Sequence, residues 1–308
     1  MSNNLKKKTK FRKWFNDDNI FYYLMIAWPV FQFAVFYIAT RFNAIMYSFQ
    51  EYSLYNNTVK WSFEPIKTAF KMMTQDYTLR TAMENSLKSF VICTVIGMTL
   101  ALLFSYYISK KFRGAGVFRV LLFLPSIISS IVIVTIFMFF VDEFIPALSQ
   151  ELFHTEMKGL LENKDTRFGC VMFYNIFMSF GVNVLMYSNA MSGISPEIVE
   201  SAQLDGASRI REFISISLPL IFPTITTFLI TGVAAIFTNQ YSLFAFYGDG
   251  FEPLLVNYGQ WLYVTSKNAS GRAEYSTVSA IGLLLTCIVL PVTLFVKWAL
   301  EKFGPSVD

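Results

Sequence analysis

The sequence predicts an all-α integral membrane protein with about six transmembrane helices. First, the chain has 25 Lys and Arg and 21 Asp and Glu among 308 residues, yet six long stretches contain none of them. Second, hydrophobic residues make up 54% of the chain and aromatic residues 18%, as expected for helices that face lipid. The charge-free stretches are residues 20–40, 90–108, 120–141, 168–191, 218–246 and 275–296.

The length and pattern of these stretches favour helices. Each is about 19 residues or longer, which at a rise of about 1.5 Å per residue crosses a hydrocarbon core of about 30 Å. Each is also continuously apolar, whereas the strands of a membrane barrel alternate between apolar and polar residues. We therefore expect one transmembrane domain over residues 20–303, followed by a short tail at 304–308.

The distribution of basic residues predicts the orientation, because Lys and Arg resist translocation. Basic residues gather in the amino-terminal segment 1–19 and in the short loop 110–119. An even number of spans then places both termini in the cytoplasm. Segment 1–19 also contains Phe11, Trp14 and Phe15, a mixture that suits a basic segment at an anionic membrane surface. The net charge of +4 requires no nucleic-acid partner.

Cysteine and histidine usage predicts neither a metal site nor a catalytic site. Cys93, Cys170 and Cys287 fall in or beside separate predicted spans, without metal-ligand spacing. The only histidine, His154, lies in a predicted outer loop. No nucleophile, base and metal ligand share a face, so we expect no catalytic residues.

The predicted inner loop 192–218 has the sequence features of two short helices. Ser195 and Pro196 suit the N-cap and first helical position, and Glu197 suits the first turn. Gly206 predicts a helix end near Asp205, and a second helix is expected to begin at residue 207 or 208. The apolar residues of the first helix are expected to form a buried stripe, made by Ile198, Ala202 and Leu204.

This loop resembles the EAA motif of binding-protein-dependent ABC importer permeases. The motif consists of a Glu, two small residues, Asp-Gly-Ala, and then Phe and Leu-Pro downstream. The matching residues here are Glu200, Ser201, Ala202, Asp205, Gly206, Ala207, Phe213, Leu218 and Pro219. Ser201 replaces the usual Ala, and it is still small enough for close helix approach.

Other segments resemble the carbohydrate type of these permeases. Tyr47-Ser48-Phe49, Phe112-Arg113-Gly114 and Phe123-Leu124-Pro125 match that group, whereas Gly248-Asp249-Gly250 stands where Gly-Gly-Pro is usual. The resemblance implies a type I ABC importer permease fold in a bacterial cytoplasmic membrane and a role in sugar import.

The resemblance also implies partner proteins. These are an extracellular substrate-binding protein, a second permease subunit, usually a different chain, and two ATP-binding subunits. The chain contains no G-x-x-x-x-G-K-[ST] sequence, so we expect no cofactor in it, and ATP and Mg²⁺ to be bound by the partners.

The small amphipathic helix of the loop is suited to docking in a groove of the ATPase subunits. Glu197, Glu200, Ser201, Ala202, Asp205, Gly206 and Ala207 are the predicted coupling residues. Glu200 and Asp205 would meet basic residues of the partner. Alternatively, Glu200 only favours the dipole of its own helix.

Polar residues within the predicted spans are the candidates for a substrate pathway, because such residues are costly in lipid. Asn175, Ser179 and Asn183 recur every four residues, on one helical face. In the related sugar permeases, polar residues stand at the positions of Asn175 and Asn239. Amides both donate to and accept from hydroxyl groups, as a neutral sugar requires. Hydrogen bonding between helices is the alternative role.

Other transport classes fit the sequence less well. An ion-coupled secondary transporter usually carries ionisable residues or broken helices within the membrane, and the predicted spans contain no Asp, Glu, Lys or Arg. A channel would need a filter loop. A secondary transporter and an ABC permease for a non-sugar solute remain the alternatives.

Overall fold

The computed structural model describes residues 17–53 and 58–305. The described residues do not include 1–16 of the predicted basic segment 1–19 or 306–308 of the predicted tail. Contacts divide the chain into two units, Met1–Thr68 with Gly271–Leu283, and Ala69–Ser270 with Leu284–Asp308. Helices α4 (Glu64–Gln75) and α16 (Arg272–Phe303) run through both. The extent of the predicted domain stays a prediction.

The first unit contains one long apolar helix and a small hairpin. The helix continues to Ser48, beyond the predicted end at residue 40. Arg41 lies within it, with its guanidinium 5.3 Å from the centre of the Tyr37 ring. In the hairpin, Gln50 pairs with Trp61, and the Gln50 carbonyl accepts a 2.6 Å hydrogen bond from Ser276. The described elements here are α2 (Asp17–Gln32), η1 (Phe33–Ala39), α3 (Thr40–Ser48), β1 (Gln50–Ser53) and β2 (Thr58–Trp61).

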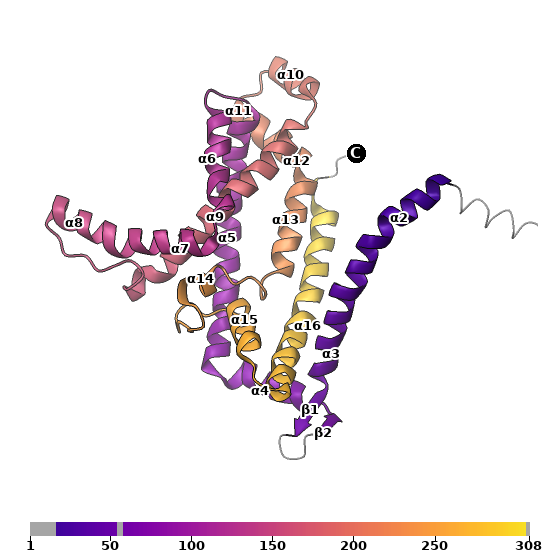
Figure 1. The fold of residues 1–308 in the computed structure, drawn as a ribbon. Helices are drawn as coiled ribbons and strands as arrows, with labels where there is room; N and C mark the ends of the chain where they lie inside the picture. The colour runs from indigo at the N-terminus through magenta and orange to yellow at the C-terminus, as the bar shows by residue number, and fades with distance from the viewer. Residues whose placement is uncertain (1–16, 54–57, 306–308) are drawn as a thin grey trace, which may run out of the picture. The chain divides into compact units, whose positions relative to one another are not determined.

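The second unit is a helical bundle, shown as a ribbon in Figure 1. Its helices are α5 (Tyr77–Ser109), α6 (Ala115–Ile127), α7 (Ser130–Phe139), η2 (Phe140–Phe144), α8 (Ile145–Phe153), α9 (Lys164–Ser192), α10 (Pro196–Leu204), α11 (Arg209–Glu212), η3 (Phe213–Ser217), α12 (Leu218–Leu220), α13 (Phe222–Ala234), α14 (Leu243–Tyr247) and α15 (Tyr258–Asn268).

Helices α5 and α9 pack closely along their length and form the centre of this bundle. Asp76 caps α5 by accepting a 3.0 Å hydrogen bond from the Leu79 amide, so α5 begins well before the predicted span at residue 90. Small residues hold the packed faces together. The Ser105 hydroxyl donates to the Val184 carbonyl of α9 at 3.0 Å.

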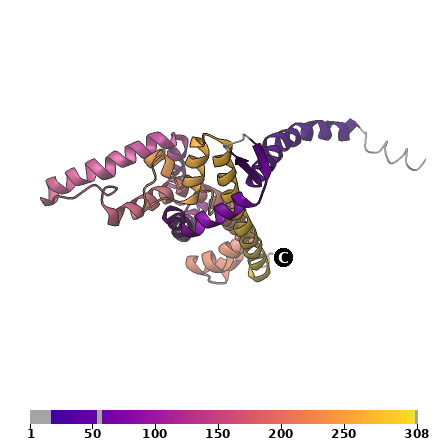
Figure 2. The same cartoon turned by 90° about the horizontal axis from the view of Figure 1, so that it is seen from below.

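The third predicted span, residues 120–141, is wrong as a single helix. Helix α6 ends at Ile127, and α7 begins at Ser130 after Ile128 and Ser129 take extended ψ values of 145° and 133°. Pro125 lies in the last turn of α6, where it removes a backbone donor and weakens the helix. Beyond the break, α7, η2 and α8 form one continuous rod, visible in Figure 2.

The fifth predicted span, residues 218–246, is also interrupted. Arg209–Leu220 and Phe222–Ala234 meet at a bend of 65°. After Ala234 the chain leaves the helix, and Tyr241 and Ser242 have positive φ values of 47° and 58°. Helix α15 lies between the fifth and sixth predicted spans, where no helix was expected, and Asn257 caps it by accepting a 2.8 Å hydrogen bond from the Gln260 amide.

The number of spans agrees with the prediction. Within the described residues, five helices are long and apolar enough to cross a membrane, or up to six if the bent pair counts as one span. The prediction of about six transmembrane helices is therefore confirmed, while two of the predicted spans have different boundaries and breaks.

Candidate functional site

The loop 192–218 forms the predicted pair of helices at the end of the bundle where α5 ends and α6 begins (Figure 1). Helix α10 ends at Leu204. Gly206 then turns the chain with φ +77°, and the Ala207 amide donates to the Ala202 carbonyl at 3.0 Å. Left-handed backbone of this kind favours glycine. The helix, glycine turn and second helix are thus confirmed.

Two details of the loop differ from the prediction. Ser195 holds the N-cap position of α10, but its hydroxyl makes no capping bond. The predicted buried stripe is wrong, because Ile198 is 45% exposed and Leu204 89% exposed, and Ile210 of α11 is 73% exposed. The reason is that the described part of this chain provides no surface opposite these side chains.

The predicted coupling residues lie together on this projecting loop. Ala202 and Ala207 are half-buried, while the others are exposed, namely Glu197, Glu200, Ser201, Asp205 and Gly206. The loop thus exposes apolar and acidic side chains side by side.

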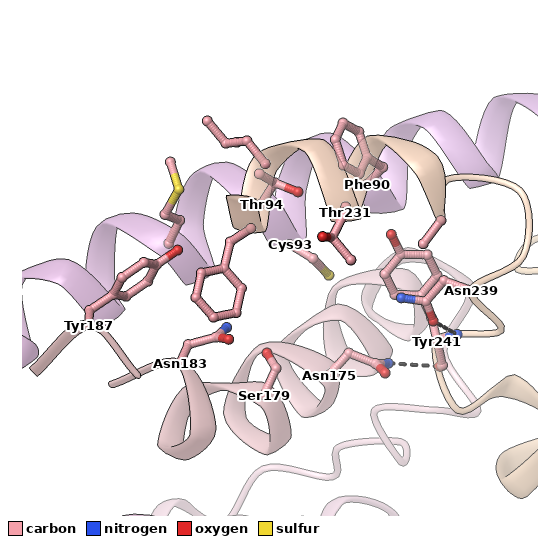
Figure 3. A pocket seen from close by; sticks show the side chains of 15 residues that line it. Phe90, Cys93, Thr94, Asn175, Ser179, Asn183, Tyr187, Thr231, Asn239 and Tyr241 are labelled. Carbon is pink, nitrogen blue, oxygen red and sulfur yellow. Dashed lines mark hydrogen bonds between the residues drawn. The ribbon is translucent and has the colours of Figure 1, made fainter. Parts of the chain in front are cut away.

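A second candidate site is a cavity of about 340 Å³ inside the second unit. Figure 3 shows its lining. Helices α5, α9 and α13 and the irregular segment 235–242 contribute side chains. Its polar lining residues are Thr94, Asn175, Ser179, Asn183, Tyr187, Thr231, Asn239 and Tyr241. The structure therefore brings the three predicted pathway residues, Asn175, Ser179 and Asn239, to one cavity.

Asn175 holds helix α9 against the irregular segment. Its Nδ2 donates to the Tyr241 carbonyl at 2.8 Å and to the Val171 carbonyl at 2.8 Å. Its Oδ1 accepts from the Ser242 hydroxyl at 3.2 Å. Both polar atoms of this amide are thus engaged within the protein, which fits the alternative role of joining transmembrane segments.

Asn239 lies in the irregular segment and not in a helix, contrary to its predicted place late in the fifth span. Its Oδ1 accepts a 2.9 Å hydrogen bond from the Tyr241 amide, and its carbonyl accepts a 3.2 Å bond from Asn257. A Cβ atom at Gly259 would clash with the Asn239 carbonyl, so α15 passes very close to this segment. Irregular backbone is tolerated in membrane proteins where it lines a cavity.

Two lining amides keep hydrogen-bonding capacity. Within residues 17–53 and 58–305, the Nδ2 of Asn239 and the whole side-chain amide of Asn183 make no hydrogen bond to the protein. Figure 3 places Asn183, Ser179 and Asn175 along one helix, on the side facing the cavity. Ser179 already donates to the Ile176 carbonyl at 3.2 Å, so the amides are the stronger candidates for binding a ligand.

The cavity lining combines amide and hydroxyl groups with apolar side chains and is uncharged. None of its 15 residues is Asp, Glu, Lys, Arg or His. Amide and hydroxyl groups can both donate and accept, so the lining suits a neutral ligand with hydroxyl groups. A phosphate or carboxylate would find no cation there to balance its charge.

Sequence reasoning missed one feature of the loop. Glu212 is 1% exposed and forms an ion pair with Lys110 at the end of α5. The sequence places a basic residue in the predicted inner loop 110–119 and an acidic residue in the loop 192–218, but it does not indicate that these two residues contact each other. It also missed the turn at Tyr241 and Ser242, because a charge-free apolar run does not reveal positive φ values.

Comparisons with known proteins agree with these observations. A family model described as "Binding-protein-dependent transport system inner membrane component" matches residues 93–308. The chain is 25% identical over 268 residues to a multiple sugar-binding transport system permease protein, MsmF, of Streptococcus mutans, covering 85% of this chain and 88% of MsmF. It is 24% identical over 296 residues to an arabinooligosaccharides transport system permease protein, AraP, of Bacillus subtilis, covering 94% and 91%.

The chain is also similar to a permease protein of a transport system for a charged solute and to a chain of a solved transporter structure. The chain is 23% identical over 226 residues to the sn-glycerol-3-phosphate transport system permease protein UgpA of Escherichia coli, covering 71% of this chain and 74% of UgpA. A chain of a bacterial ABC transporter involved in the import of the acidic polysaccharide alginate matches with a TM-score of 0.77 and 19% identity, covering 97% of this chain and 99% of that one. This likeness shows that the two chains share a fold.

Proposed function

Because this chain belongs to the family of binding-protein-dependent transport system inner membrane components, we propose that it is a permease subunit of an ATP-binding-cassette importer for a neutral sugar or oligosaccharide. In this role it forms half of the translocation pathway. The chain is a multi-pass membrane protein, and we place it in a bacterial cytoplasmic membrane with both termini in the cytoplasm.

The exposed apolar surface of α10 and α11 carries the proposal for ATP coupling. Leu204 and Ile210 are 89% and 73% exposed on a loop that also presents Glu200 and Asp205. Apolar anchors with acidic residues beside them suit the surface of a soluble partner that has a groove and basic side chains. We therefore propose that two ATP-binding subunits dock here, and that ATP and Mg²⁺ are bound there and not in this chain.

The position of the loop supports the proposed orientation. A Cβ atom at Gly304 would clash with the Phe222 ring, so the end of α16 lies beside the start of α13, directly after the loop and α12. The carboxyl end of α16 and the loop thus share one end of the second unit. If the loop meets cytoplasmic ATPase subunits, the described carboxyl end of the chain is cytoplasmic too.

The uncharged cavity supports a neutral cargo. Relatives include permeases of systems for sugars, for arabinooligosaccharides and for sn-glycerol-3-phosphate, so the family alone leaves the cargo open. The lining of amides and hydroxyls, with no cation among its 15 residues, favours the neutral carbohydrates. The partners of the proposed complex are a second, different permease chain and an extracellular binding protein.

The test is reconstitution in lipid vesicles of the complex that co-purifies with this chain from its native membrane. At least one neutral sugar from a panel of mono- and oligosaccharides is expected to be taken up, and only when ATP and the binding protein are present. Uptake of sn-glycerol-3-phosphate and of alginate oligomers is not expected. A sodium or proton gradient replaces ATP in the control. Uptake by this chain alone, driven by such a gradient, would show a secondary transporter instead.

A further inference from the structure

Glu212 is buried, whereas the other acidic residues of the loop 192–218, namely Glu197, Glu200 and Asp205, are exposed. Its residue exposure is 1%, whereas Arg209, Ile210 and Arg211 around it are exposed. Burying a carboxylate is costly unless the charge is paired and hydrogen-bonded. Its position therefore depends on the groups that compensate the charge.

The compensating groups come from two different elements. Lys110, which caps the carboxyl end of α5, forms an ion pair with Oε1 of Glu212. Gln203 of α10 donates from Nε2 to Oε2 of Glu212 at 3.5 Å. One carboxylate thus connects α5, α11 and the first helix of the loop.

Further contacts surround this ion pair, and we call the whole set the α5–α11 junction. The Tyr106 hydroxyl donates to the Arg209 carbonyl at 3.1 Å, and the ring centres of Tyr106 and Phe213 are 5.0 Å apart. The Arg209 guanidinium lies 5.1 Å from the centre of the Phe112 ring. The junction consists of Tyr106, Lys110, Phe112, Arg209, Glu212 and Phe213.

Helix α5 connects the junction directly to the cavity. It is an unbroken helix of 33 residues, and Phe90, Cys93, Thr94 and Met98 of this helix line the cavity. Cys93 and Lys110 are separated by about 25 Å along a helix, at about 1.5 Å per residue. A displacement of the carboxyl end of α5 would therefore reach the cavity wall.

The other two cavity helices are joined to the loop less rigidly. Helix α9 reaches α10 through a non-helical turn at residues 193–195. Helix α13 follows a bend of 65° after Arg209–Leu220. Among the three, α5 is the helix that side-chain charge holds to the loop.

We propose that the Lys110–Glu212 ion pair transmits movement of the loop to α5, and through α5 to the wall of the cavity. The proposal rests on the proposed function, because an ATPase subunit must move the loop. In it, Lys110 and Glu212 are positioning residues that bind neither ATP nor cargo. Networks of packed side chains and ion pairs can carry energetic coupling between distant sites.

The experiment follows Cys93 as a reporter on α5. Cys170→Ala and Cys287→Ala leave Cys93 as the single thiol of this chain, since the chain contains 3 Cys. The rate at which a small methanethiosulfonate reagent labels Cys93 is measured in the reconstituted complex with and without ATP. Uptake per ATP hydrolysed is measured in parallel, with the neutral sugar that the wild-type complex imports. Glu212→Gln and Lys110→Met break the pair, and Lys110→Glu with Glu212→Lys reverses it.

The matched control is the exposed ion pair of Glu84 and Lys88 on the same helix, in which Lys88 Nζ lies 3.2 Å from Glu84 Oε2. Glu84→Gln and Lys88→Met should leave both readouts unchanged. In Glu212→Gln and Lys110→Met, uptake per ATP is expected to fall at least about tenfold, and the ATP-dependent change in Cys93 labelling to disappear. The charge-reversed double variant should restore both.

Several outcomes would overturn the inference. One is an unchanged uptake per ATP hydrolysed in Glu212→Gln and Lys110→Met. Another is a Cys93 labelling rate that does not depend on ATP in the Cys170→Ala, Cys287→Ala background protein, while that protein still imports sugar. Failure of either single variant to assemble with the ATPase would show a purely structural pair. A background protein that shows no ATP-driven uptake at all contradicts the proposed function instead, so the two failures are distinguishable.

Discussion

The side-chain amide of Asn175 donates a 2.8 Å hydrogen bond to the backbone carbonyl of Tyr241, 66 residues away. Tyr241 has a positive φ of 47°, which is strained for an aromatic residue. The amide of one helix thus stabilises an unusual turn in another segment, and both residues line the same cavity. Asn175 therefore has a structural role at the cavity wall.

Asn175→Leu is expected to destabilise the protein as well as reduce uptake. It leaves the Tyr241 carbonyl and the Ser242 hydroxyl without their partner, at a cost of about 1 to 3 kcal/mol. Thermal unfolding in detergent and uptake of the transported sugar measure the two effects. Ser179→Ala on the same helix is the control for stability, because Ser179 bonds only the Ile176 carbonyl of its own helix. An unchanged melting temperature in Asn175→Leu would contradict the role in holding the turn.

Asn183→Leu is expected to change uptake without changing stability. Its amide has no partner within the described residues and lines the cavity, so its removal costs the fold little. If the amide binds a sugar hydroxyl in transit, loss of that bond would alter uptake by about five-fold to hundred-fold. Uptake rates for several neutral sugars measure the effect. The same change at Asn189, which lies outside the cavity lining and accepts a 3.3 Å hydrogen bond from Arg119, should leave the uptake rates unchanged and act only on stability.

Gly206→Val is expected to weaken binding of the ATPase while leaving membrane insertion intact. No atom lies within 4 Å of a Cβ added at this site, so the effect comes from the φ of +77° alone. A β-branched residue in left-handed backbone is strained by about 1 to 3 kcal/mol. Gly206→Asn should be milder, since Asn tolerates this conformation. The amount of ATPase that co-purifies with each variant measures the effect, and Gly116→Ala is the control. Equal binding by all variants would refute the need for this turn.

Leu204→Ser is expected to reduce ATPase binding and leave the stability of this chain alone unchanged. The side chain is 89% exposed, so it contributes almost no burial within the chain. If a partner covers it, the loss of apolar burial would cost about 1.5 to 3 kcal/mol. The affinity of the purified ATPase for the permease in detergent measures the change. Undiminished affinity would mean that the partner does not cover Leu204.

Gly181→Ala is expected to separate α6 from α9 and destabilise the bundle. A Cβ at Gly181 would clash with the backbone carbonyl of Leu122, and forcing atoms into a packed interface typically costs about 1 to 3 kcal/mol. Gly169→Ala on the same helix is the matched control, because nothing lies within 4 Å of its added Cβ. The difference in unfolding temperature between the two variants measures the effect. Equal temperatures would contradict this close approach.

The sequence was most informative where one physical property decides the structure. Absence of charge over about 19 residues identifies a helix that can span a membrane, and Gly206 after a capped helix predicts a turn that the structure contains. Asn175 and Ser179 were placed on one cavity face by a spacing of four.

Breaks and pairings were less predictable. The interruption at Ile128 and Ser129 lies in an uncharged run, and Pro125 with the nearby serines does not tell whether a helix bends or stops. The Lys110–Glu212 pair joins residues about 100 apart, and a long-range pairing depends on the packing of the whole bundle. The exposure of Leu204 was mispredicted because an apolar stripe looks the same whether its own chain or a partner covers it.

The uncharged lining of the cavity has an electrical consequence for the proposed importer. A potential of 100 mV contributes about 2.3 kcal/mol for each elementary charge that crosses the membrane. A neutral cargo moving past the 15 uncharged lining residues carries no charge through this half of the pathway. The membrane potential then neither assists nor opposes that step. A cell whose potential has collapsed would still import its sugar for as long as its ATP lasted.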